Sequence, residues 1–99
     1  MLKKMKQPKS DAVKLCQLVD EILWRMWDPL GINDEENCRG EYQSYAYMVA
    51  GMLERGADKH EIVEYLAQVQ SEEMGLSGMD KRYTEQVARE ICAAYGRLR

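Results

Sequence analysis

One stretch of the chain begins like a zinc-protease motif but does not complete it. His60-Glu61-Ile62-Val63-Glu64 matches the pattern H-E-x-x-H at its first two positions, and Glu64 stands where the second histidine belongs. Two imidazoles one helical turn apart are needed to hold zinc, and His60 is the only histidine in the chain. We therefore expect no zinc site, and an exposed histidine at the start of a helix instead.

The acidic run from Asn33 to Glu36 suggests calcium, but neither possible register fits. An EF-hand loop needs glycine at its sixth position and glutamate at its twelfth. A loop starting at Asn33 puts Cys38 at the glycine position, and one starting at Glu35 puts Ala46 at the last position. We expect neither a metal ion nor a cofactor.

The three cysteines give no disulfide framework and no nucleophile. They are Cys16, Cys38 and Cys92, an odd and widely spaced set. Cys16 and Cys92 fall on apolar helix faces, where a thiol acts as a small hydrophobe. Cys38 lies in a polar stretch with no histidine nearby to activate it. Since the glycines are also scattered, without a phosphate-binding loop, the sequence predicts a protein that is not an enzyme.

The net charge of −3 is unevenly distributed along the chain. Residues 1–9 carry four lysines and no acid, whereas residues 28–41 carry five acids against Arg39 alone. Residues 54–73 carry six acids against two basic residues, and the last twenty residues turn basic again. An acidic middle repels nucleic acid and attracts a basic protein.

The length of 99 residues predicts one domain, with residues 1–9 as a flexible basic tail and residues 10–99 as the folded part. The basic N-terminus is not followed by the apolar stretch of a signal peptide. The sequence contains no run of about 18 apolar residues, which is the length needed to span a membrane. We expect a cytoplasmic protein.

Apolar side chains recur at three- and four-residue steps, which is the period of an amphipathic helix, and this spacing predicts the helices that position the residues above. The first helix is predicted from an N-cap at Ser10 to Trp27, and Pro29 ends it. The second is predicted from about Arg39 to Arg55, with Gly56 as its C-terminal glycine.

The third helix is predicted to open at Asp58, with Glu61 completing an acidic capping box, and to end at Met74-Gly75. The short link before it predicts an antiparallel hairpin with the second helix. The fourth helix is predicted from Ser77 or Asp80 to Tyr95, with Gly96 as its stop. No segment alternates like a strand, so we expect an all-α, single-domain bundle of about four helices.

Aromatic residues near the acidic segment allow two interpretations. Trp27 either caps the core, with its indole N–H bonded to a nearby carbonyl, or is exposed as an anchor for a partner. Tyr42, Tyr45 and Tyr47 cover more than half of the circumference of one helix, so they cannot all point inward. Tyr47 is the one we expect to be exposed.

The turn Trp27-Asp28-Pro29-Leu30-Gly31-Ile32 resembles a motif of small, uncharacterised bacterial helical proteins. Their pattern continues with a Glu-Tyr pair, here Glu41-Tyr42, and a Gly-Ala link, here Gly56-Ala57; the likeness covers about residues 22–76. Such proteins are similar to immunity proteins of contact-dependent growth inhibition and other polymorphic toxin systems. The resemblance implies a toxin inhibitor, and it supplies no catalytic residue.

Charge and resemblance together predict a protein-binding module. Toxins that cut nucleic acid need a cationic surface for phosphate, and carboxylates can occupy that surface as phosphate mimics. The expected partner is therefore a basic, nuclease-like toxin, and the expected contact residues are Asp34, Glu35, Glu36, Glu41 and Tyr42. The alternative is a helical housekeeping or scaffold protein with another protein partner, or a homodimer.

Overall fold

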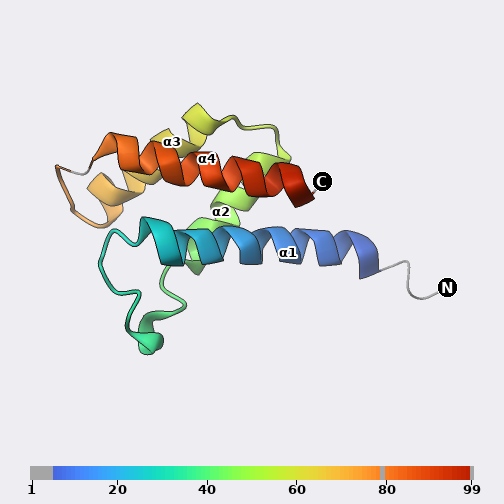
Figure 1. Ribbon diagram of the computed structural model, residues 1–99, viewed down its shortest axis with the longest axis horizontal. Helices are drawn as coiled ribbons and strands as arrows, with labels where there is room; N and C mark the ends of the chain where they lie inside the picture. Colours follow the sequence, from blue (N-terminus) through green and yellow to red (C-terminus); the bar gives the residue numbers. More distant parts are fainter. Residues whose placement is uncertain (1–5, 79, 99) are drawn as a thin grey trace.

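The computed structural model describes the backbone of residues 6–78 and 80–98, and the side chains of residues 12–78 and 80–98. Its four α-helices are α1 (Lys6–Ile22), α2 (Gln43–Glu54), α3 (Lys59–Gln68) and α4 (Lys81–Leu98) (Figure 1). The π-helical turns Leu23–Trp27 and Val69–Glu73 extend α1 and α3, and Glu36–Cys38 form a 3₁₀ turn. These residues contain no strand, which confirms the prediction of an all-α single-domain bundle.

Three helix ends differ from the prediction. The second helix begins at Gln43 rather than at about Arg39, because the chain before it forms a 3₁₀ turn at Glu36–Cys38 and further turns. The first helix begins at Lys6, so only residues 1–5 of the predicted tail lie outside the described residues. Pro8 is tolerated there because the first N–H groups of a helix have no acceptor within it. The fourth helix runs through Gly96 to Leu98, which packs against the core. A glycine inside a helix costs only about 1 kcal/mol, which this packing outweighs.

The turn between α2 and α3 is a Schellman motif. Gly56 has a φ of +93°, its N–H donates to Leu53 O at 3.0 Å, and the N–H of Ala57 donates to Met52 O at 2.9 Å. The predicted capping box then opens α3, with Asp58 and Glu61 each accepting the backbone N–H of the other at 2.9–3.0 Å. Both boundary predictions are confirmed.

The pairing of helices differs from the predicted hairpin of the second and third helices. α2 packs on α1, and α3 packs on α4, while α1 also packs on α4. Figure 1 shows α3 and α4 side by side and α1 along the other side of the bundle. The apolar face of α2 is therefore covered by α1. Packing of α2 on α1 decides the arrangement, and the short link between α2 and α3 does not force those two helices to pack as a hairpin.

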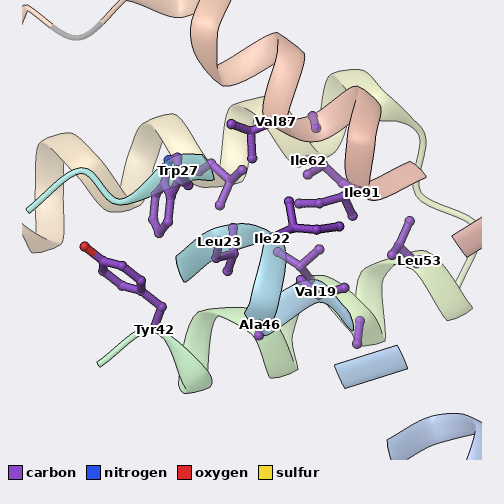
Figure 2. Packing of buried hydrophobic residues seen from close by; sticks show 14 of the residues in the cluster. Val19, Ile22, Leu23, Trp27, Tyr42, Ala46, Leu53, Ile62, Val87 and Ile91 are labelled. Atoms are coloured by element: carbon purple, nitrogen blue, oxygen red, sulfur yellow. The ribbon is translucent and has the colours of Figure 1, made fainter. Parts of the chain in front are cut away.

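The core draws apolar side chains from every helix (Figure 2). Among those with no measurable exposure are Val19, Leu23, Val49, Ile62, Leu66, Val87 and Ile91. Each buried aliphatic side chain contributes roughly 1.5–3 kcal/mol relative to exposure. The core continues into an aromatic cluster at the end of α1, where the ring of Trp27 stands edge-on to Tyr42 at 5.5 Å and to Tyr45 at 6.0 Å.

Trp27 is 2% exposed, so the core interpretation is correct and the anchor interpretation is wrong. Its indole Nε1 has no hydrogen-bond partner among the described residues, so the expected bond to a carbonyl is absent. The edge-to-face packing of the indole against two tyrosine rings holds it without that bond.

Within the described residues, no helix has both the length and the apolar character needed to cross a bilayer.

Candidate protein-binding surface

The candidate surface lies on the connection between α1 and α2, residues 28–42, which we call the acidic loop. Asp28 organises its start: φ is +28°, and its N–H donates to Leu23 O at 2.9 Å, closing the π-helical turn. Asp28 Oδ1 accepts the N–H of Ile32 at 2.9 Å, and Oδ2 accepts the N–H of Asn33 at 3.3 Å. One carboxylate thus satisfies the backbone that the proline turn leaves without partners.

The far end of the loop is tied to the same carboxylate. Tyr42 donates its hydroxyl to Asp28 Oδ1 at 2.9 Å and accepts the N–H of Leu30 at 3.2 Å. Burial raises the pKa of the Tyr42 hydroxyl, and the hydrogen bond to Asp28 raises it further. The hydroxyl therefore stays protonated and donating at neutral pH.

The prediction that Tyr42 contacts a partner is wrong. Tyr42 is fully buried, with its ring 6.0 Å from that of Trp24 and 5.5 Å from that of Trp27. The sequence pattern shared with the small bacterial helical proteins could have indicated this internal contact, because it contains both Trp27-Asp28 and Glu41-Tyr42. The two halves of the motif form one internal contact.

Arg39, the one basic residue of the loop, is turned toward α1. Its Nη1 lies 2.9 Å from Asp20 Oδ2 and its Nη2 lies 2.9 Å from Glu21 Oε1. The guanidinium carbon also lies 5.0 Å from the centroid of the Trp24 ring, a cation–π distance. Asn33 adds a second tie to α1 by donating its amide N–H to Trp24 O at 3.1 Å.

Asp34, Glu35, Glu36 and Glu41 are all exposed, as predicted. No described residue gives their carboxylates a hydrogen bond or an ion pair. Backbone hydrogen bonds of 2.9–3.1 Å link successive turns of this segment, from Ile32 O to the N–H of Glu41. The loop projects from one end of the bundle, at the lower left of Figure 1. The structure therefore places four carboxylates on one anchored loop, none of them paired with a cation of the part of the chain that is described.

The other groups singled out from the sequence lie away from this loop. His60 is exposed, with its Nε2 3.6 Å from Glu64 Oε2. Burial raises the pKa of the Cys16 and Cys92 thiols, which lowers their thiolate content at neutral pH. Within the described residues, no three histidine, cysteine or acidic side chains gather in a way that could hold a metal ion.

No protein-family model, curated protein or solved structure significantly matches this chain. The resemblance to immunity proteins therefore stays a prediction from the Trp-Asp-Pro-x-Gly motif. The structure gives that motif a physical role, since its aspartate and tyrosine fasten both ends of the acidic loop.

Proposed function

We propose that this protein is a non-catalytic inhibitor that binds a basic protein through the acidic loop. In its specific form, it is a cytoplasmic immunity protein that neutralises a bacterial toxin with a nuclease domain. The observation that carries the proposal is the charge pattern of the loop: its four exposed carboxylates have no cation partner among the described residues, and Arg39 pairs with α1 instead.

The anchoring of the acidic loop indicates that its exposed carboxylates bind a partner rather than only keep the protein in solution. A loop that is already ordered loses little conformational entropy when a partner binds. Repulsion among Asp34, Glu35 and Glu36 raises the energy of the free protein, and a cationic surface relieves it. Charge complementarity also speeds association, which an inhibitor of a toxic enzyme needs.

The partner chemistry follows from what nucleases must bind. A nuclease carries a cationic surface for phosphate groups, and exposed carboxylates on a fixed loop can occupy that surface. The resemblance to immunity proteins of polymorphic toxin systems adds the bacterial context, and it rests on the turn motif alone.

The test is co-expression with the protein encoded by the neighbouring gene, followed by pull-down and a survival assay. The wild-type chain should bind and protect, and Glu35→Lys/Glu36→Lys should bind weakly and protect poorly. The matched control is Glu72→Lys/Glu73→Lys, which changes the charge equally at two exposed residues outside the loop. Equal losses from both double variants, or no binding by the wild type, would refute the proposal.

A further inference from the structure

Arg39 pairs with carboxylates on α1, although a carboxylate of the loop is nearer to it in the sequence. The N–H of Arg39 donates to Glu36 O at 3.1 Å, at the end of the 3₁₀ turn. Side chains three residues apart lie one above the other in such a turn, so the Glu36 carboxylate is within reach of the guanidinium. The structure instead pairs Arg39 with Asp20 and Glu21, each at 2.9 Å. Contacts on α1 therefore hold the guanidinium more firmly than the loop does.

Two features of α1 and its π-helical turn explain this pairing. The side chain of Asp20 is only 12% exposed, so water screens its attraction to a cation less than that of an exposed loop carboxylate. The ring of Trp24 adds a cation–π contact, with its centroid 5.0 Å from the guanidinium carbon of Arg39. Residues 29–41 contain no aromatic side chain that could offer the same contact.

Glu21 joins a second arginine to this arrangement. Its Oε2 lies 3.1 Å from Arg25 Nε, while its Oε1 lies 2.9 Å from Arg39 Nη2. Asp20, Glu21, Arg25 and Arg39 thus form a chain of alternating charges, which we call the α1 cluster. Its two carboxylates balance its two guanidinium groups, so the cluster adds no net charge beside the loop. The four exposed loop carboxylates therefore keep their negative charge.

We propose that Asp20 and Glu21 are positioning residues for partner binding, because they hold Arg39 on α1 and keep the only cation of the loop away from its carboxylates. This role rests on the proposed function, since it keeps the acidic loop free for a cationic protein. It extends that function to two residues outside the loop, neither of which needs to touch the partner. Without them, the guanidinium is free to pair with Glu36 and to neutralise part of the surface that the partner meets.

A nuclear magnetic resonance titration with an octalysine peptide at low salt tests the charge of the loop without the natural partner. In the wild-type chain, the peptide should shift the amide signals of residues 34–36. Asp20→Asn/Glu21→Gln should raise the peptide dissociation constant about fivefold or more, because Arg39 then competes with the peptide for the same carboxylates.

The matched control is Glu64→Gln/Glu90→Gln. It removes the same number of negative charges from two exposed residues, which lie 3.6 Å from His60 Nε2 and 3.9 Å from Arg97 Nη2. Both residues lie outside the loop and the α1 cluster, so this variant should change the dissociation constant by less than about twofold. A larger effect of the control would attribute the loss to net charge and overturn the proposal.

Removal of Arg39 separates the effect of its charge from a loss of structure. Asp20→Asn/Glu21→Gln/Arg39→Gln lacks the cation as well as the two acids, so it should bind the peptide within about twofold of the wild type. If the acids only tied the loop to α1, the triple variant would bind no better than the double variant, because the tie is absent from both. The amide spectra show whether each variant is folded. If the double variant does not fold, Glu21→Gln alone should still raise the constant about twofold.

Three results would overturn the proposal. They are a wild-type loop whose amide signals do not respond to the peptide, acid-to-amide variants that bind as tightly as the wild type, and a triple variant that does not recover binding. Failure of the proposed function appears in a different experiment, the pull-down with the protein encoded by the neighbouring gene, because the peptide titration does not use that protein.

Discussion

The hydroxyl of Tyr42 is the single group whose removal should loosen the acidic loop without disturbing the core. Tyr42→Phe keeps the ring against Trp24 and Trp27 and deletes two hydrogen bonds, to Asp28 Oδ1 and from the N–H of Leu30. A bond to a charged group contributes about 1.5–3 kcal/mol and a neutral one about 0.5–1.5 kcal/mol. Asp28 Oδ1 keeps its bond from Ile32, so we expect a net loss of about 2–3 kcal/mol.

Urea unfolding measures this loss as a change in the free energy of unfolding, and amide hydrogen exchange shows where it acts. Exchange should accelerate at Leu30, Ile32 and Asn33, whose N–H groups depend on the Asp28–Tyr42 pair. Tyr47→Phe is the control, because its hydroxyl is exposed and its loss should change stability by less than about 0.5 kcal/mol. If both variants lost the same stability, the account of the loop anchor would be wrong.

Three further predictions follow from the same contacts. Burial raises the pKa of Tyr42 in the folded state, so the folded protein holds the hydroxyl proton more tightly than the unfolded chain does. The free energy of unfolding should therefore fall as pH rises above about 10, the pKa of tyrosine in the unfolded chain. Urea midpoints should show a smaller fall over this pH range for Tyr42→Phe. Arg39→Ala leaves the mostly buried Asp20 carboxylate without its cation. Because the Arg39 side chain is one-third exposed, we expect the free energy of unfolding, measured with urea, to fall by about 2 kcal/mol. A fall below about 0.5 kcal/mol would contradict the pairing. Gly56→Ala should lower the melting temperature, because Gly56 has a φ of +93° that alanine rarely adopts. Gly96→Ala should raise the free energy of unfolding by about 0.5–1 kcal/mol, because Gly96 lies inside α4 and a Cβ there would meet no other atom. Changes of the same sign in both variants would contradict this account.

The helices could be predicted from the sequence because their signals are local. Apolar spacing, the Asp58–Glu61 capping box and Gly56 all act within a few residues, and the structure contains each of them. Besides the start of α2 at Gln43, two further ends are misplaced, at Lys6 and Leu98, and these two have the same cause. A proline in the first turn and a glycine near the end are weak stops, which the rest of the helix outweighs.

The internal contacts of the acidic loop could not be predicted in this way. Tyr42 reaches Asp28 across 14 residues, and Arg39 reaches Asp20 across 19 residues. The local pattern singles out Tyr47 as exposed, but it does not show that Asp28 takes the Tyr42 hydroxyl, so Tyr42 is also predicted to contact a partner beside Glu41. The exposure of the four acids was predictable because a carboxylate without a partner is costly to bury.

The packing of α2 on α1 could not be predicted for a related reason. These two helices are separated by the whole acidic loop, and the short link after α2 favoured pairing with α3 instead. Only the exposure of Tyr47 could be inferred, because three tyrosines on one helix cannot all face the core.

The most direct test of the central claim is the association rate constant with the basic partner, measured at increasing salt. The wild-type chain should associate fast at low salt and slow markedly as salt screens the charges, as should Glu72→Lys/Glu73→Lys. Glu35→Lys/Glu36→Lys should associate slowly at low salt and respond little to added salt. A wild-type rate that does not depend on salt, or a loop variant that associates as fast as the wild type, would contradict the claim that the acidic loop makes the contact.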